Sequence, residues 1–352
     1  MFLRNCWYVA AWDNEVGREP FHRVLLNEPV VLYRRGDGAP VALADRCCHR
    51  ALPLSMGTVV GDRLQCGYHG LEFDDTGTCV RVPGQTTVPP GAAVRAYPVV
   101  ERWQWIWIWM GDPELADDSQ IPNWWWMDHP DWRVVKGNGG APIPTACDYE
   151  LVTDNLLDLT HLSFVHTDTI GNDEITRFPC RTERGENIVR MMRMMHDVDP
   201  APFYKMAGRF PGNVDRWQIV ETVLPAHTDV DVGCAEIGSG VLDGDRNQGV
   251  AFHALNSATP ETETTCHFFF AHPRLFATDS DEMDEVYRRD FYKVFMEDVV
   301  IMEAQQRNHD RAPDRGFVDI NVDSPALTVR RMLRERIAAE PADGGAVARE
   351  SA

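Results

Sequence analysis

The chain has 352 residues, 44% of them hydrophobic, and a formal net charge of −20 at pH 7. This length suffices for two domains that each bury a core, and the negative charge argues against the basic surface that binding to nucleic acid or to an anionic membrane requires. The opening segment has only a short apolar run, and no later stretch approaches the length of a membrane span. Nine cysteines without a disulfide-like framework favour a reducing, cytoplasmic location.

From about residue 30 to 110, short β-rich runs alternate with Gly, Pro and Asp, which predicts strands joined by tight turns. The run RWQWIWIWM within this region alternates tryptophan with other residues. Because Ile106 and Ile108 fill its other face, we expect a strand buried on both sides rather than a cofactor site. The pattern predicts an all-β domain over residues 1–115.

Four candidate metal ligands lie in two short, glycine-flanked motifs of this region, Cys47-x-His49 and Cys66-x-x-His69. Two thiolates and two imidazoles are the ligands of a Rieske [2Fe–2S] centre, in which one iron takes two Cys and the other takes two His. A structural zinc site uses the same residue types. Zinc fingers usually take two Cys from one loop and two His from the other, whereas each loop here carries one of each. The arrangement therefore favours the iron–sulfur cluster.

Residues 116–145 are rich in Pro, Gly and acidic residues, which predicts a linker. A second domain is expected over residues 146–340, and it opens with a helical segment from 149 to about 165. After several β-rich stretches, a long helix is expected from about 281 to 308. The tail, 341–352, is expected to fray.

The helical segment that opens the second domain carries His161 and His166, five residues apart. Five residues turn a regular helix by about 500°, so the two imidazoles diverge by about 140°. Binding one metal together would require local unwinding or an i→i+5 bulge between them, and such bulges are frequent at functional sites. Asn155, Asp158 and His161 follow at steps of three and share one face, which brings a carboxylate beside the first imidazole.

The long C-terminal helix places Asp298 in the middle of its apolar face, among residues that include Phe295 and Met302. A buried carboxylate is costly unless a cation balances it. Two His and one carboxylate form the facial triad of non-haem Fe(II), which leaves positions open for O2. The alternative is an ion pair between Asp298 and a buried arginine. Glu297 and Glu303 point away from this face and are predicted to be solvated.

With both sites considered, the chain resembles the Rieske non-haem iron oxygenases, in particular the vanillate O-demethylase and dicamba monooxygenase branch. The resemblance extends over nearly the whole chain, in segments such as CHRALPLSMG, CGYHGLEF, DNLLDLTHLSFVH, TPETETTCHFFFA and EDVVIMEAQQRN. It implies an α+β protein with an N-terminal all-β Rieske domain and a C-terminal helix-grip catalytic domain, in which an antiparallel sheet holds a long helix. One departure is Cys48, where the family usually has Pro.

The resemblance also implies cofactors and their ligands. The two Cys–His motifs would bind a [2Fe–2S] cluster, and His161, His166 and Asp298 would bind a mononuclear Fe(II). Asp158 would connect the cluster ligand His69 of one protomer to His161 of the next, in a homotrimer.

Around the iron, the resemblance puts Asn155 near the metal and Asn256 at the substrate, with His253 as the alternative if the alignment shifts. His267 and Arg274 are nearby in the sequence and are candidates to bind an anionic ring substituent. A hydrogen-bonded structural role is the alternative for each of the candidate substrate contacts.

The implied activity is that of the terminal oxygenase of a monooxygenase system in aromatic catabolism. An NADH-dependent flavin- or ferredoxin-type reductase would supply electrons. With O2, the enzyme would O-demethylate a methoxylated acidic aromatic compound and release formaldehyde. Methyl hydroxylation, N-demethylation and ring dihydroxylation are alternatives within the family. A Rieske electron carrier without catalysis is the alternative from another class, and it predicts no second iron.

Overall fold

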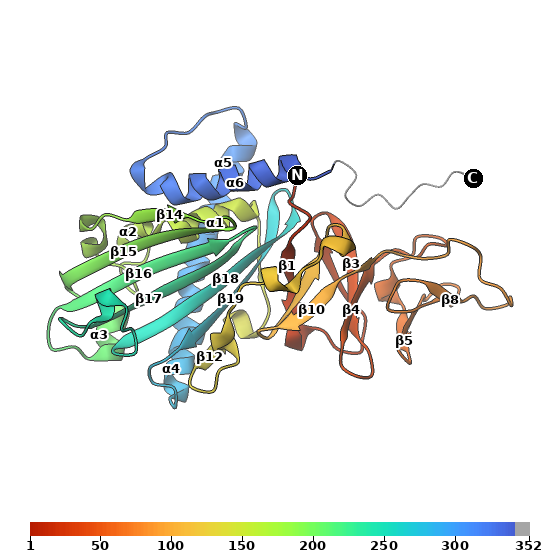
Figure 1. The fold of residues 1–352 in the computed structure, drawn as a ribbon, viewed down its shortest axis with the longest axis horizontal. Helices are drawn as coiled ribbons and strands as arrows, with labels where there is room; N and C mark the ends of the chain where they lie inside the picture. Colours follow the sequence, from red (N-terminus) through yellow and green to blue (C-terminus); the bar gives the residue numbers. More distant parts are fainter. Residues whose placement is uncertain (342–352) are drawn as a thin grey trace. The chain divides into compact units, whose positions relative to one another are not determined.

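The computed structural model describes residues 1–341, which form two compact units (Figure 1). The first unit contains Met1–Ile121, Thr259–Glu263 and residues 336–341, and the second contains Pro122–Ala258 and Thr264–Glu335. All of the predicted tail except its first residue lies outside the described residues. Among the helices of the described part of the chain, none is long and apolar enough to cross a membrane.

The first unit is built from small antiparallel sheets, three of them within the described residues. In order of pairing, their strands are β1 (Trp7–Trp12), β11 (Trp105–Trp109) and β10 (Val99–Arg102); β2 (Phe21–Leu25), β3 (Glu28–Arg34), β4 (Pro40–Ala44) and β9 (Ala96–Tyr97); and β5 (Thr58–Val60), β6 (Arg63–Gln65), β7 (Glu72–Phe73) and β8 (Cys79–Arg81). The prediction of a β-sheet N-terminal domain is thereby confirmed.

Strand β11 contains most of the tryptophan run and is buried along its whole length. It lies between β1 and β10, and the rings of Trp7 and Trp109 meet edge to face with their centroids 5.5 Å apart. Trp103 lies outside the strand, in a turn where its φ is 58°. The tryptophans of β11 are therefore core residues, as the alternation predicts.

The second unit is a large antiparallel sheet with helices (Figure 1). The strands pair in the order β12 (Arg133–Lys136), β19 (Thr265–Arg274), β18 (Val250–Thr262), β17 (His227–Glu236), β16 (Val214–Val223), β15 (Ile188–Val198) and β14 (Arg181–Arg184), and β13 (Ile143–Thr145) also pairs with β19. The helices are α1 (Tyr149–Leu157), α2 (Leu162–Val165), α3 (Pro202–Gly208), α4 (Asp281–Val286), α5 (Tyr292–Arg311) and α6 (Ser324–Ala339).

The segment 116–145, predicted as a linker, contributes two strands to this sheet, β12 and β13. Val135 and Ile143 on these strands are only 3% and 4% exposed. The Pro- and Gly-rich composition marks the turns between the strands, and the apolar residues within them provide the buried contacts. The linker prediction was therefore wrong for this part of the chain.

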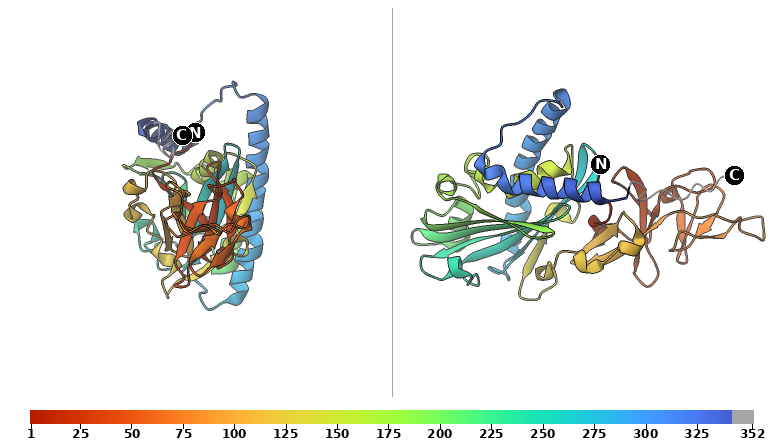
Figure 2. Two further views of the ribbon diagram at one scale, coloured as in Figure 1. Left: turned by 90° about the vertical axis from the view of Figure 1, so that its right-hand side faces the viewer. Right: turned by 45° about the horizontal axis from the view of Figure 1, so that its top comes forward.

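Helix α5 lies along one face of the sheet, and Figure 2 shows it in two further views. Phe295 of α5 packs on Phe268 and Phe270 of β19, with ring centroids 5.3 and 4.2 Å apart. The predicted combination of an antiparallel sheet with a long helix is confirmed. The helix is not continuous, because a π-helical turn, Tyr287–Phe291, separates α4 from α5. Such turns add a residue to the helix and are frequent near functional sites.

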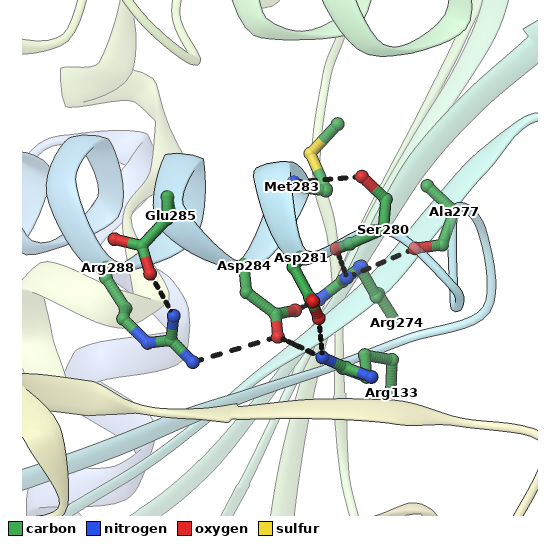
Figure 3. A network of polar contacts seen from close by, with 9 residues as sticks. All are labelled: Arg133, Arg274, Ala277, Ser280, Asp281, Met283, Asp284, Glu285 and Arg288. Atoms are coloured by element: carbon green, nitrogen blue, oxygen red, sulfur yellow. Dashed lines mark hydrogen bonds and ion pairs between the residues drawn. The ribbon is translucent and has the colours of Figure 1, made fainter.

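Asp284 in α4 forms a buried ion-pair cluster with arginines of two strands (Figure 3). Its carboxylate accepts a hydrogen bond from Arg133 Nε at 3.0 Å and lies 2.6 Å from Arg274 Nη1. Arg274 is completely buried. Burial raises the pKa of Asp284, but the guanidinium groups of Arg133 and Arg274 outweigh this effect and hold the pKa below its ordinary value. The cluster fastens α4 to β12 and β19.

Replacing Asp284 with alanine is expected to destabilise the second unit by about 3–5 kcal/mol, because it leaves the buried charge of Arg274 unpaired. Chemical denaturation measures the loss. The matched control is Asp281→Ala, since the Asp281 side chain is 90% exposed and also contacts Arg133, and its effect should stay below about 1 kcal/mol.

The contribution of Asp284 also depends on pH. A carboxylate whose pKa is lowered by folding stabilises the native state above its unfolded-state pKa, and this contribution disappears as the pH falls through the folded-state pKa. The stabilities of the wild type and of Asp284→Ala should therefore converge in acid. A variant as stable as the wild type at neutral pH would contradict the assignment.

Candidate metal centres and substrate cavity

The two Cys–His motifs lie on loops of the same shape in the first unit. In each loop the cysteine N–H donates to the carbonyl oxygen five residues on, at 2.9 Å from Cys47 and 2.8 Å from Cys66. The N–H four residues on donates back to the cysteine carbonyl, at 2.9 and 3.0 Å respectively. That fourth residue, Ala51 or Gly70, is left-handed, with φ of 57° and 74°. The two loops thus present their cysteines equivalently.

Glycine allows the backbones around these loops to approach closely. A Cβ on Gly57 would lie 2.1 Å from the carbonyl oxygen of Gln65, and a Cβ on Gly67 would lie 2.6 Å from that of Met56. Both distances are shorter than van der Waals contact permits, so these positions require glycine. The glycines that flank the motifs therefore serve to bring the two loops together.

The four predicted cluster ligands differ in exposure. Cys47 and Cys66 are buried, whereas His49 and His69 are exposed and their ring centroids lie 4.5 Å apart. Burial raises the pKa of the Cys47 thiol to about 11, so a metal that binds there displaces a proton. Buried thiols beside exposed imidazoles fit a Rieske cluster whose His-bound iron faces the surface.

His161, His166 and Asp298 come together in the second unit, where their potential ligand atoms lie within 4.8 Å of one another. Asp298 Oδ1 is 3.0 Å from His166 Nε2 and 3.4 Å from His161 Nε2. Asp298 is 5% exposed, and within the described residues its ionic contacts are these imidazoles rather than an arginine. Two imidazole nitrogens and a carboxylate fit a non-haem Fe(II) site.

The chain departs from regular helix at two points, just before His161 and at His166. Helix α1 ends at Leu157, Asp158 has non-helical φ and ψ of −107° and 83°, and a 3-10 turn, Leu159–His161, follows. Between the histidines the chain is helical as α2, and His166 ends α2 with φ of −114°. Unwinding was expected between the two histidines, but the break occurs on the N-terminal side of the first.

The surroundings of this site shift the pKa values of His166 and Asp298. Burial lowers the pKa of His166, but Asp298 and Glu297 outweigh this effect and raise it. Burial raises the pKa of Asp298, but hydrogen bonds from His161 and His166 bring it to about 2. Asp298 is therefore ionised at neutral pH and can bind a divalent cation without first losing a proton.

Glu297 also belongs to the site, although the sequence predicted a solvated side chain. Its Oε2 lies 2.8 Å from His166 Nδ1 while 30% of the side chain stays exposed. A carboxylate at Nδ1 directs the other ring nitrogen, Nε2, toward a metal. In the same way, His161 Nδ1 contacts the backbone carbonyl of Asp158. The prediction was wrong because a glutamate side chain is long enough to reach the imidazole from the edge of the apolar face of α5.

Replacing Glu297 with alanine is expected to lower the affinity for the mononuclear iron by about 10–100-fold, because His166 loses the group that orients it. Iron content after dialysis against a graded chelator series measures the change. Lys293→Ala is the matched control, since the Lys293 ammonium lies 3.6 Å from Glu297 on the solvent side and pairs with that carboxylate. Equal iron retention by Glu297→Ala and the wild type would contradict the orienting role.

A cavity opens beside His161, His166 and Asp298, among α1, α5 and the sheet. Its apolar walls include Leu156, Leu162, Val230, Phe252, Ala254 and Phe291. Its polar side chains include Arg216, Gln218, Asn256 and His272. Burial lowers the pKa of His272 to about 3, so this ring is neutral at neutral pH. Mainly apolar walls with a few polar groups are typical of a site for a small organic ligand.

Asn155 and Asn256 both line this cavity, as their predicted roles require. Asn155 Nδ2 donates to Asp298 Oδ1 at 3.2 Å, beside the candidate iron ligands. The carboxylate of Asp158 is half-buried and accepts a hydrogen bond from the Thr160 N–H at 2.8 Å.

The other candidate substrate contacts lie elsewhere. His253 does not line the cavity: its ring stacks on Trp126 at 3.9 Å and lies 2.9 Å from Asp229 Oδ1. His253 and Asn256 are an odd number of residues apart on β18, so they face opposite sides of the sheet. Arg274 is neutralised by Asp284, and His267 is not among the cavity-lining residues. The prediction of His253 as the alternative substrate contact is therefore wrong, because this residue does not line the cavity.

Comparison with known proteins identifies two domain families in the chain. The Rieske [2Fe-2S] domain family matches residues 6–98, and the vanillate O-demethylase oxygenase C-terminal domain family matches residues 145–339. The toluene-4-sulfonate monooxygenase system iron-sulfur subunit of Comamonas testosteroni is 41% identical, over 96% of this chain and 97% of its own length. A vanillate O-demethylase oxygenase subunit of Pseudomonas sp. is 37% identical, over 100% of both chains.

Solved structures agree with these relationships. Dicamba monooxygenase bound to 3,6-dichlorosalicylic acid matches with a TM-score of 0.89 and 34% identity, over 97% of this chain and 99% of that chain. A structure of the same enzyme with non-haem iron and dicamba matches with a TM-score of 0.82 and 33% identity, over 96% and 98% of the two chains. The predicted α+β fold and both predicted cofactors are thereby confirmed.

Proposed function

Because the chain belongs to the Rieske non-haem iron oxygenases of the vanillate O-demethylase type, we propose that it O-demethylates a methoxylated, acidic aromatic compound. The relatives support an aromatic acid, since their names include vanillate, dicamba and toluene-4-sulfonate. The observation that carries the proposal is the cavity in which His161, His166 and Asp298 meet apolar walls.

We propose that His161, His166 and Asp298 hold the mononuclear iron and that Cys47, His49, Cys66 and His69 hold the [2Fe–2S] cluster. When bound, the iron supplies O2 activation and the cluster supplies single electrons. The protein orients the imidazoles, excludes water with apolar walls and positions the aromatic ring.

The proposed overall reaction converts a methoxyarene, O2, NADH and a proton into a phenol, formaldehyde, water and NAD+. A separate reductase is the expected electron source, since a named relative is one subunit of a monooxygenase system. We propose an NADH-dependent flavin- or ferredoxin-type reductase for this role. A Rieske centre with two His ligands has a higher potential than an all-Cys ferredoxin centre, so electrons pass to it downhill.

We further propose that the enzyme works as a homotrimer, in which Asp158 connects His69 of a neighbouring protomer to His161. Two observations support this role. His69 is exposed, so a neighbouring protein can reach it. Asp158 lies at the break before His161, and its backbone carbonyl already contacts the imidazole. Asn155, hydrogen-bonded to Asp298, would shape the open side of the iron.

Methyl hydroxylation is the second candidate reaction, and the 41% identity to the toluene-4-sulfonate monooxygenase subunit favours it. Product analysis separates the two reactions. The holoenzyme, a compatible reductase and NADH are incubated with vanillate or with toluene-4-sulfonate. Formaldehyde in equal amount to the phenol supports O-demethylation, and a benzylic alcohol without formaldehyde supports methyl hydroxylation. NADH consumption without either organic product would contradict both.

A further inference from the structure

Two arginines of the sheet, Arg193 on β15 and Arg216 on β16, are buried without an ion pair among the described residues. They are 3% and 1% exposed. The third buried arginine of the described residues differs, because Arg274 pairs with Asp284 at 2.6 Å. For Arg193, the nearby charge of Asp158 opposes the lowering of the pKa by burial. A buried cation without a counter-ion is costly, so Arg216 in particular requires an explanation.

The groups that face Arg216 do not neutralise it. Its guanidinium carbon lies 4.7 Å from the ring centroid of Tyr204, and Cys234 is its direct neighbour on β17. Burial raises the pKa of Tyr204 and that of Cys234 to about 12, so both are protonated at neutral pH. Arg216 Nη2 donates to the carbonyl of Ile170 at 2.9 Å, whereas Nε and Nη1 have no hydrogen-bond partner.

Gln218 follows on the same face of β16 and adds a further unpaired donor. Its Oε1 accepts a hydrogen bond from Arg193 Nη1 at 3.0 Å, and Arg193 Nη2 donates to Thr160 Oγ1 at 2.9 Å. The bond from Arg193 fixes which end of the amide is oxygen, so the amide nitrogen of Gln218 is the end without a partner. Arg216 and Gln218 both line the cavity beside the candidate iron ligands.

The other cavity groups are less suited to an anion. The amide nitrogen of Asn256 is used by the carbonyl of Ala254 at 2.8 Å, which leaves only its acceptor oxygen unpaired. Asp298 is the carboxylate among the cavity-lining residues, and both imidazoles already contact it. Positive charge and unused N–H donors therefore coincide at Arg216 and Gln218.

We propose that Arg216 and Gln218 form the anion subsite of the substrate cavity and bind the sulfonate or carboxylate of the aromatic substrate. Arg216 supplies the charge and N–H donors, and Gln218 supplies an amide donor. Arg193 is a positioning residue that holds the Gln218 amide in the donating orientation. Charge-assisted hydrogen bonds from a guanidinium to an oxyanion are among the strongest that proteins make. The inference rests on the proposed function and deepens it by naming the residues that select an acid.

Binding to the oxidised holoenzyme, measured by calorimetry under argon without reductase, tests the subsite independently of turnover. The probes are two pairs that differ in charge but little in shape: toluene-4-sulfonate with toluene-4-sulfonamide, and vanillate with vanillamide. The variants are Arg216→Gln, Arg216→Lys and Gln218→Leu. Arg190→Gln is the matched control, because Arg190 is exposed on β15 and pairs with Glu221.

In the wild type we expect at least one acid to bind more tightly than its amide. Arg216→Gln should weaken binding of that acid by about 30-fold or more, with less than about a threefold change for the amide. Arg216→Lys should keep part of the preference, because the charge remains but the planar fork is lost. Gln218→Leu should reduce the preference, and Arg190→Gln should leave it unchanged. The visible spectrum of the cluster verifies that each variant is folded.

Two results would overturn the subsite. The first is a wild type that binds neither acid more tightly than its amide. The second is equal weakening of acid binding and amide binding in both Arg216→Gln and Arg216→Lys. Failure of the proposed function has a different signature. Acids would then bind with the expected preference, but the complete system would release neither formaldehyde nor a benzylic alcohol.

Discussion

The variant His161→Ala is expected to lose the mononuclear iron and all oxygenation activity while it keeps the visible spectrum of the [2Fe–2S] cluster. His161 Nε2 lies 3.4 Å from Asp298 Oδ1, and without the imidazole only His166 and Asp298 are left to bind the metal. An open catalytic metal site depends on all of its few protein ligands, so the remaining pair should bind iron too weakly to retain it. Total iron should fall from three to two per chain.

Metal analysis and optical spectroscopy on the same sample measure this result. His196→Ala is the matched control: the side chain is 64% exposed on β15, pairs with Asp215 and should keep all of the iron. Loss of both the cluster and the mononuclear iron would show that His161 does not belong to the mononuclear site alone. Full iron content with normal activity would remove His161 from the ligand set.

The variant Asp158→Asn is expected to bind both cofactors normally and to lose turnover by about 100-fold or more. The substitution keeps the shape of the side chain and the backbone carbonyl that contacts His161. It removes the negative charge beside His161 that would accept a hydrogen bond from His69 of the neighbouring protomer, and changes to such orienting partners have large effects on activity. Reduction of the cluster by the reductase should be unaffected.

Stopped-flow measurement of cluster reoxidation, with substrate and O2 present, isolates the step that should be slow. Asp168→Asn is the matched control, because Asp168 is exposed and lies two residues after His166. Normal reoxidation in Asp158→Asn would defeat the bridging proposal. Loss of iron in this variant would instead assign Asp158 to the metal site itself.

Local spacing was enough to predict the ligand candidates. The motifs that contain Cys47 and Cys66 specify two loops whose hydrogen bonds are contained almost entirely within each loop, so sequence distance determines their geometry. Asp298 stood out because helical periodicity puts it on an apolar face. The loop motifs and the helical periodicity both depend on residues that are close in the sequence. Sequence patterns are informative over this short range.

The features that sequence analysis missed depend on contacts between distant segments. The amide nitrogen of Gln218 stays unpaired because Arg193, on the adjacent strand, occupies the amide oxygen, and strand register is a tertiary property. The pairing of Arg274 with Asp284 likewise joins a strand to a helix. His253 and Asn256 were alternatives, and their odd separation on β18 means that only one of them can face the cavity. Which of the two does so depends on the placement of the strand in the fold.

The cluster around Asp284 and the iron ligand Asp298 lie on one interrupted helical rod, α4 with the π-turn and α5. Iron that binds only the folded protein shifts the folding equilibrium by mass action, by about 2.7 kcal/mol at a free concentration of 100 times its dissociation constant. Substitution of Asp284 should therefore lower the measured stability most clearly in the iron-free protein, because bound iron compensates for part of the loss. Iron bound at Asp298 thus offsets part of the stability that is lost when Asp284, on the same rod, is replaced.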